Sequence, residues 1–257
     1  MPPVKRNCRA YAPGGVSKVI TAHLRKLRRR THISADEEQA IRSAVTETRN
    51  VPAGRLLIRC GETLNHSMLL IEGWMAGVKD LQGGSRQVTE LQLPGDFADL
   101  QGFTLKSLDR DVVALTNAKV GLVPHDRLRE VTDRLPRLGW IYWSMTNIDA
   151  AITRELVISL AQRSAISRMA HLFCEISYRL EVVGGASKNG CDFPLTQREL
   201  SECLGLTVVH VNRTLQELRR RGLVELENRQ LTIRDRAGLE ALAEFDPSYL
   251  YLDQHRL

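Results

Sequence analysis

The sequence predicts an α+β protein with an N-terminal antiparallel β domain, one long helix and a C-terminal winged helix-turn-helix. Short apolar runs broken by glycines between Asn50 and Val123 are typical of a small β sandwich or barrel. Apolar residues with heptad spacing after Pro124 predict the long helix. Two short capped helices followed by two short strands between Pro194 and Asp235 predict the winged helix-turn-helix.

The chain of 257 residues is long enough for two modest domains, each with its own core. We expect a basic N-terminal arm and helix in residues 1–33, the β domain in 34–134, the long helix in 135–163 and the winged helix-turn-helix domain in 164–257. The most apolar segment, Ala150 to Leu160, is interrupted by Arg154 and Glu155, which excludes a membrane span. The N-terminus lacks the pattern of a secretory signal, so we expect a cytoplasmic protein.

Positive charge is concentrated at the N-terminus, because no acidic residue precedes Asp36. The net charge of +6 favours a polyanionic partner. Val16, Ile20, Leu24 and Leu27 recur at helical spacing, so a helix from about residue 16 to residue 30 can pack on the next domain with its arginines in water. Direct contact of this arm with DNA is the alternative.

The β domain follows a short helix predicted over Ala35 to Thr48, where Ser34 and Glu37 form a capping box. Glycine-rich turns then separate the expected strands. The Gly-Gly-Ser segment between Asp80 and Arg86 is a suitable connection for a hairpin.

The long helix carries a heptad pattern that predicts a dimer seam. The alternative is a helix that packs only on the sheet of its own chain. A second helix is expected from Ala165 to Leu180, with a domain boundary at 162–164 and a hinge at about 162–167, where the heptad pattern ends. The predicted seam residues are Leu138, Ile141, Met145, Ile148 and Ile152.

The helix-turn-helix is predicted from its caps and glycines. Thr196 and Glu199 form a capping box, and Gly205 ends a helix of about nine residues. Thr207 caps a second helix, which runs to Arg221. Two short strands around the polar turn 227–230 then form a wing.

The two faces of the second helix differ in a way that favours DNA binding over a merely solvated basic helix. Val211, Leu215 and Leu218 should pack inward. A valine among polar and basic residues on the opposite face suits the major groove, where valine contacts thymine methyl groups, arginine binds guanine and asparagine pairs with adenine. The expected base contacts are Val208, Val209, Asn212, Arg213 and Gln216, and the expected phosphate contacts are Thr196, Thr207, His210, Arg219, Arg220 and Arg221.

From about Val16 to Ile233 the chain resembles the Crp/Fnr family of bacterial transcription regulators, on the segments LPGDFADLQGF and LTQRELSECLGLTVVHVNRTLQELRRRGLV. The resemblance implies a jelly roll of the cyclic-nucleotide-binding type and a homodimer joined along the long helix. It also implies a winged helix-turn-helix on near-palindromic DNA, with RNA polymerase as a further partner. Val208, Val209 and Arg213 match the family's usual base-contacting positions, and only Arg213 keeps the common residue.

The candidate effector pocket implied by the resemblance consists of Gly95, Phe97, Asp99 and Arg110. Asp111 stands where the family has a hydroxyl, and its carboxylate would repel a phosphate or occupy Arg110. The expected glycine before Asp99 is also missing. We therefore expect a regulator that does not require cyclic AMP, and the alternative is a cyclic-nucleotide-gated regulator or signalling module.

The five cysteines are too scattered for a zinc or iron–sulfur site, and Cys8 stands alone at the N-terminus, so no cofactor and no metal are expected. Cys191, in a polar glycine-flanked segment, is the candidate redox thiol. Control by an unknown small molecule, by thiol oxidation or by abundance alone all remain open. The motifs GxSxG and HExxH and the P-loop are absent and His66, His125 and His171 are isolated, so an enzyme is not expected.

Overall fold

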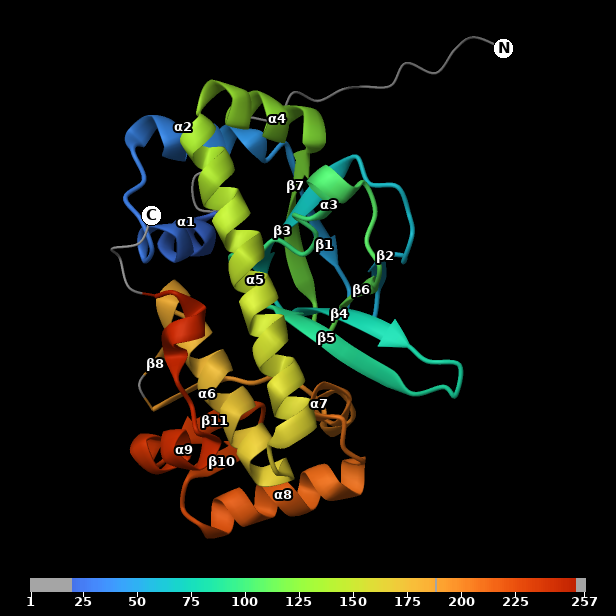
Figure 1. The fold of residues 1–257 in the computed structure, drawn as a ribbon, viewed down its shortest axis with the longest axis vertical. Coiled ribbons are helices and arrows are strands. Elements are labelled where there is room, and N and C mark those ends of the chain that lie inside the picture. The colour runs from blue at the N-terminus through green and yellow to red at the C-terminus, as the bar shows by residue number, and fades with distance from the viewer. Residues whose placement is uncertain (1–19, 188, 253–257) are drawn as a thin grey trace.

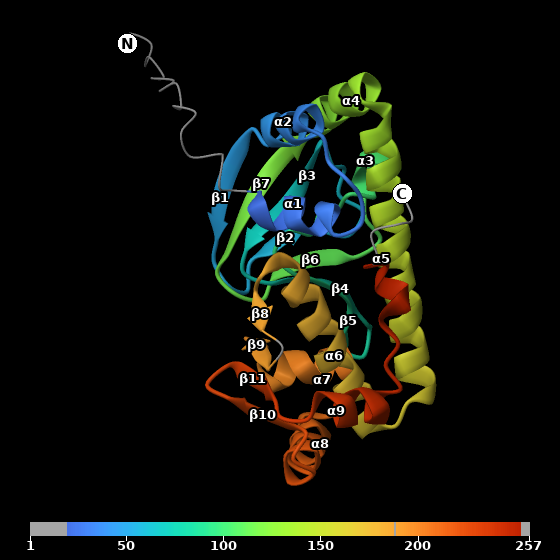
Figure 2. The same cartoon turned by 90° about the vertical axis from the view of Figure 1, so that its left-hand side faces the viewer.

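The computed structural model describes residues 20–187 and 189–252, and they form a β domain and a helical domain joined along one long helix (Figure 1). The long helix, α5 (Pro136–Gln162), runs beside both domains. Figure 2 shows α1 (Thr21–Arg28) between the β domain and the helical domain. The predicted α+β class and the predicted order of the parts are confirmed.

The N-terminal helices pack on the β domain. Ile20, Leu24 and Leu27 are each 1% exposed, which confirms the packed face predicted for the first helix, while Val16 lies outside the described residues. The helix α2 (Ala35–Ala44) begins at the predicted capping box of Ser34 and Glu37. It ends earlier than predicted, because the chain turns into the mostly polar strand β1 (Glu47–Val51), which hydrophobic periodicity did not reveal.

Two antiparallel sheets form the β domain. One has the order β1-β7-β3 and the other β2-β6-β4-β5. Pairing of Asp80 with Arg86 confirms the predicted hairpin between β4 and β5. The further strands are β2 (Leu56–Ile58), β3 (His66–Glu72), β4 (Met75–Asp80), β5 (Arg86–Gln92), β6 (Asp111–Ala114) and β7 (Ala118–Pro124), with the short helices α3 (Gly102–Leu105) and α4 (His125–Arg134) beside them.

The predicted dimer seam on α5 is wrong in its choice of face. Leu138, Ile141 and Met145 are at most 4% exposed and belong to the same hydrophobic cluster as α1. Ile148 is 6% exposed, and Ile152 is half-buried. Heptad spacing shows that a helix has an apolar face, but it does not show which neighbour covers that face, and here the covering neighbour is the same chain.

The opposite face of α5 is open to solvent and also follows heptad spacing. Trp140 and Trp143 are 64% and 57% exposed, and Val157 and Ile158 are 60% and 48% exposed. The exposed positions at alternating spacings of three and four are Trp140, Trp143, Asn147, Ala150, Arg154, Val157 and Ala161.

The helical domain begins where α5 ends. Arg163 is extended and Ser164 caps α6 (Ala165–Val183), so the two helices break at the predicted boundary. A sheet of order β10-β11-β9-β8 covers one side of the domain. Its other elements are β8 (Ala186–Ser187), β9 (Gly190–Asp192), α7 (Gln197–Leu204), α8 (Val208–Arg220), β10 (Val224–Glu227), β11 (Gln230–Ile233), α9 (Arg236–Ala243) and the 3-10 turn η2 (Pro247–Leu250).

The two domains share one hydrophobic cluster. Trp74 and Val88 of the β domain belong to the same cluster as Phe173 and Phe193 of the helical domain. The rings of Trp74 and Phe193 meet edge to face, with their centroids 5.8 Å apart. The outer face of the second sheet is therefore part of the core beneath the helix-turn-helix.

Within residues 20–187 and 189–252, no helix combines the length and the apolar composition that a membrane crossing requires.

Candidate nucleic-acid interface and effector cavity

The helices α7 and α8 form the predicted helix-turn-helix at the end of the molecule farthest from α4 (Figure 1). Thr196 and Glu199 form the predicted capping box of α7. Gly205 adopts φ +60° at the turn between the helices, a conformation that favours glycine. The Thr207 hydroxyl accepts a hydrogen bond from the His210 N–H, so α8 also begins at its predicted cap.

The two faces of α8 differ as the sequence predicts. Val211 and Leu218 are fully buried and Leu215 is 6% exposed, so this face packs inward. Val209 is 69% exposed and Val208 is 38% exposed. Arg213 and Gln216 are exposed on the same outer face, and nothing within the described chain covers them. An exposed apolar side chain next to an exposed guanidinium and an amide matches the chemistry of major-groove base edges.

The polar groups of α8 differ in how much of their hydrogen bonding the chain itself uses. Arg220 and Arg221 both pair with Glu217, at 2.8 Å in each case. Asn212 donates to the Gln197 side chain at 2.9 Å. Among the residues that the structure describes, the Arg213 side chain has neither a hydrogen bond nor an ion pair, so its guanidinium is free for a partner. The Arg219 guanidinium donates to the Leu226 carbonyl of the wing.

The wing is a tight hairpin beside α8. Glu227 pairs with Gln230 across a two-residue turn. Asn228 and Arg229 both have positive φ, at 51° and 62°, which is typical of a two-residue hairpin turn. The predicted wing is confirmed.

A cavity of about 640 Å³ lies between the β domain and α5, beside Arg110 of the expected effector pocket. Arg110 lines it, together with Glu90 and with Asp149 and Arg154 of α5. Gly95, Phe97 and Asp99 are not part of its wall. Phe97 is 8% exposed and packs against His23 and Tyr142, and Gly95 accepts a hydrogen bond from His23.

Asp99 is buried in the β domain and does not line the cavity. It is fully covered, and its carboxylate accepts a hydrogen bond from the Met68 N–H at 2.6 Å. Burial raises the pKa of Asp99 to about 7. The Asp99 side chain is therefore a structural acceptor for β3, which the sequence comparison alone could not distinguish from a ligand contact.

The charge of Arg110 is paired within the chain, but the close partner is Glu90 and not the expected Asp111. Arg110 pairs with Glu90 at 2.5 Å and its side chain is only 6% exposed. Asp111, the partner suggested by the sequence, instead accepts a hydrogen bond from the Cys60 N–H at 2.7 Å. Burial raises the pKa of Glu90 despite this pairing. A phosphate at Arg110 would compete with the Glu90 carboxylate, which already holds the Nη2 atom of the guanidinium.

Cys191 does not have the exposure expected of a redox thiol. It lies in β9, is 5% exposed, and burial raises its pKa to about 12. A buried thiol that remains protonated is unreactive. Cys174 and Cys203 are also buried, Cys60 is exposed, and Cys8 lies outside the described residues.

Metal ligands do not gather in the described part of the chain: no three His, Cys, Asp or Glu residues among 20–187 and 189–252 are placed to hold an ion.

A buried ionic cluster that the sequence analysis missed joins the parts of the molecule. Asp96 pairs with Lys26 of α1 and, at 2.8 Å, with Arg179 of α6. Burial alone would raise the pKa of Asp96, but these two cations lower it to about 2. Arg179 also pairs with Glu175, which accepts a hydrogen bond from the Tyr249 hydroxyl near the C-terminus. The participating residues are far apart in sequence, so no local pattern announces them.

Two family models match the chain, and they match in the order seen in the structure. Residues 48–134 match the cyclic nucleotide-binding domain. Residues 167–242 match the Crp-like helix-turn-helix domain.

Relatives match over most of their length. The chain is 26% identical over 211 residues to the "Transcriptional activator protein FnrA" of Stutzerimonas stutzeri, covering 82% of this chain and 86% of that protein. It is 27% identical over 200 residues to the "Transcriptional activator protein FnrL" of Cereibacter sphaeroides, covering 77% and 80%.

Among solved structures, FixK2 from Bradyrhizobium japonicum has the same fold, with a TM-score of 0.70, 23% identity, and coverage of 76% of this chain and 96% of that one. The two domain matches, the named relatives and the shared fold agree with the geometry of α7, α8 and the wing. The chain belongs to the Crp/Fnr family of transcription regulators.

Proposed function

We propose that this regulator is a homodimer that binds near-palindromic DNA through α8 and does not require cyclic AMP. The observation that carries this proposal is the outer face of α8, where Val209 is 69% exposed beside a free Arg213. The residues on this face would gain partners when α8 enters a major groove. We place its action in the cytoplasm, with RNA polymerase as a further partner.

Base and phosphate contacts divide along α8. Val208, Val209, Arg213 and Gln216 are exposed and suit base edges. Asn212 would have to exchange its hydrogen bond with Gln197 for an adenine, which makes it a weaker determinant. The remaining groups would contact phosphates at the ends of α7 and α8, and these are Thr196, Thr207, His210, Arg219, Arg220 and Arg221.

Dimerisation uses the exposed face of α5. Trp140, Trp143 and Val157 are all more than half exposed and repeat at heptad spacing, which is the pattern of a helix that pairs with a second copy. Asn147 lies within this face and would favour one register through pairing with its own counterpart. Two copies of α8 held in this way meet a site with two half-sites.

Independence from cyclic AMP follows from Arg110. Its guanidinium is held by Glu90 at 2.5 Å inside the cavity wall. A nucleotide phosphate would compete with a carboxylate that is already in place, and the displaced Glu90 would lie near the bound phosphate. This arrangement disfavours the alternative of a cyclic-nucleotide-gated regulator.

The proposal is tested by equilibrium binding of the purified protein to a selected palindromic duplex and to random duplex, at about 0.15 M salt, with and without cyclic AMP. We expect about 10³-fold tighter binding to the selected duplex in the absence of nucleotide. Binding that appears only after addition of cyclic AMP would mean that the nucleotide displaces Glu90. Equal binding to both duplexes would remove the role of α8 in base recognition.

A further inference from the structure

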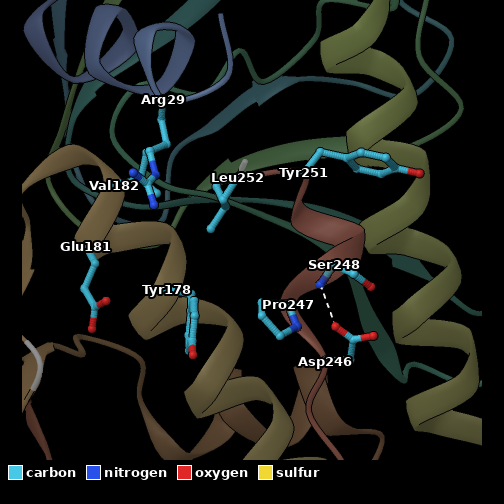
Figure 3. A pocket seen from close by; sticks show the side chains of 9 residues that line it. All are labelled: Arg29, Tyr178, Glu181, Val182, Asp246, Pro247, Ser248, Tyr251 and Leu252. Carbon is cyan, nitrogen blue, oxygen red and sulfur yellow. Dashed lines mark hydrogen bonds between the residues drawn. The ribbon is translucent and has the colours of Figure 1, made fainter. Parts of the chain in front are cut away.

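A second cavity, of about 580 Å³, lies where the N-terminal helix, the DNA-binding domain and the C-terminal segment meet. Its walls come from α1, α6 and the segment that contains η2 (Figure 3). Residues 246–252 of this segment follow the end of the matched helix-turn-helix domain at residue 242. The cavity is separate from the one beside Arg110, with which it shares no lining residue. Its volume is in the range of small-molecule sites.

Much of the cavity wall is apolar or aromatic. Tyr178 and Val182 of α6 line one side, and Pro247, Tyr251 and Leu252 line the other (Figure 3). The Tyr178 hydroxyl donates to Glu240 at 2.9 Å, and the Arg236 guanidinium lies 4.4 Å from the centre of its ring. The ring is thus fixed in place before any ligand enters, which lowers the entropic cost of binding against it.

The charged groups of the wall differ in whether they are already bound. Glu181 pairs with Arg236 at 2.5 Å. Asp246 accepts a hydrogen bond from the Ser248 N–H at 2.9 Å, as the dashed line in Figure 3 marks. The Arg29 side chain has no hydrogen bond or ion pair with any residue in 20–187 or 189–252, and Figure 3 shows it extending from the end of α1 toward the cavity. The cation at the α1 end is therefore the one charge without a partner among the described lining residues.

We infer that this cavity binds a small aromatic carboxylate, with the carboxylate on Arg29 and the ring between Tyr178 and the C-terminal segment. A guanidinium binds a planar carboxylate through two parallel hydrogen bonds. An aromatic body matches the tyrosine and proline walls. An amine of the same shape would meet an unpaired cation and two carboxylates that already have partners.

A ligand in this position would link the two domains. Arg25 of α1 donates to the Val183 carbonyl of α6 at 2.8 Å, and Arg30 donates to the Leu250 carbonyl at 3.0 Å. A carboxylate on Arg29 would add a contact to this junction and so favour the present placement of α8 relative to the β domain. Ligand and DNA must then alter each other's affinity by the same factor. This coupling rests on the proposed DNA binding, whereas the binding of the carboxylate does not.

The test is calorimetric titration of the full-length protein, without DNA, with benzoate and phenylacetate, and with benzylamine and benzyl alcohol as matched probes. We expect saturable binding of one acid per chain with a Kd of about 1 mM or below, and no saturation by the amine or the alcohol. Arg29→Ala should weaken binding of the acid about tenfold or more. Arg28→Ala is the matched control, because Arg28 is exposed on the same helix and pairs with Glu38 outside the cavity. It should bind the acid as the wild type does.

Three results would overturn the inference: no saturable binding of either acid, equal binding of acid and amine, or equal loss in the Arg29 and Arg28 variants. Thermal unfolding of each variant verifies that it is folded. A titration of selected duplex with and without the acid then measures the coupling. Acid binding without DNA binding would contradict the proposed function but support the carboxylate site. DNA binding without acid binding would support the proposed function but contradict the carboxylate site.

Discussion

The outer face of α8 and the wall of the effector cavity both present an arginine, and the two arginines are in opposite states. Arg213 is exposed and has no partner among the described residues, whereas Arg110 is 6% exposed and bound to Glu90 at 2.5 Å. The same type of side chain is therefore available to an external partner in one place and held by the fold itself in the other. The neighbours of an ionisable group, more than its type, decide which role it has.

The two faces of α5 repeat this contrast with apolar residues. The inner face, with Ile141 and Met145, is closed on its own chain, and the outer face, with Trp143 and Val157, is open. Changes on closed surfaces should alter stability, and changes on open surfaces should alter association. Each of the following experiments tests that division.

The largest effect is expected on the open face of α5. Trp143→Asp with Val157→Asp should abolish the dimer, because two carboxylates per chain would be buried in an apolar interface. Loss of the linkage between half-sites should weaken binding to the palindromic duplex by about 10²–10⁴-fold. Sedimentation and duplex titration measure both effects. Ile148→Asp, on the closed face, should instead lower the unfolding free energy, and a double variant that still sediments as a dimer would place the interface elsewhere.

The next largest effect is expected at the closed arginine. Glu90→Ala removes the close ion pair of the buried Arg110, leaving only the longer pair with Asp109 at 3.7 Å, and should lower the unfolding free energy by about 3 kcal/mol. Chemical denaturation measures the loss. Glu130→Ala, which removes the exposed pair with Arg127, should cost less than about 1 kcal/mol. Equal losses in the two variants would contradict the view that the buried ion pair of Arg110 stabilises the fold.

The open arginine should behave in the opposite way. Arg213→Ala should leave stability nearly unchanged and cost about 1–3 kcal/mol on the selected duplex, with relaxed preference at one base pair. Arg220→Ala should weaken binding to selected and random duplex alike and reduce the salt slope by about one. Duplex titrations at several salt concentrations separate the two variants. A uniform loss with Arg213→Ala would assign it to phosphate contact.

A smaller effect, on the pH dependence of stability, is expected from the buried His171. Burial, and secondarily Arg163, lowers its pKa from 6.5 to about 3. Below about pH 6.5 the His171 imidazole is protonated in the unfolded chain but stays neutral in the native state. The unfolding free energy therefore decreases as pH falls from 6.5 toward 3, by up to about 1.4 kcal/mol per pH unit. His171→Phe should reduce the loss of unfolding free energy between pH 7 and pH 5.5 by about 1 kcal/mol. An unchanged pH dependence would mean that His171 titrates alike in both states.

Local sequence signals predicted the parts of the molecule that depend on local chemistry. The capping boxes at Ser34 and Thr196 both form, and Gly205 turns where the sequence places the turn. The inward and outward faces of α8 were predictable because a helix on a core buries its apolar face, and α8 has only one continuous apolar face. The hairpin and wing followed from turn residues in the same way.

Features that depend on tertiary partners were not predictable. The heptad residues of α5 pack against their own chain. Cys191 is surrounded by polar residues in sequence but packs in a hydrophobic core. The shortest ion pair of Arg110 is with Glu90, 20 residues away in β5, while the adjacent Asp111 accepts a hydrogen bond from the Cys60 N–H. Arg110 lies just before β6 and Asp111 is the first residue of that strand, so the direction of each side chain depends on how the chain enters the sheet, which adjacency in sequence does not reveal.

The hydrophobic cluster shared by Trp74, Val88, Phe173 and Phe193 limits how freely this protein can be recombined. A helix-turn-helix cut out at the break after α5 would expose one wall of its own core, and the β domain left behind would expose the matching wall. The two should therefore melt in a single transition. A chimera that exchanges DNA specificity with another regulator would have to carry the β4–β5 hairpin along with α8. The segment that must be exchanged as a unit is therefore larger than the helix-turn-helix itself.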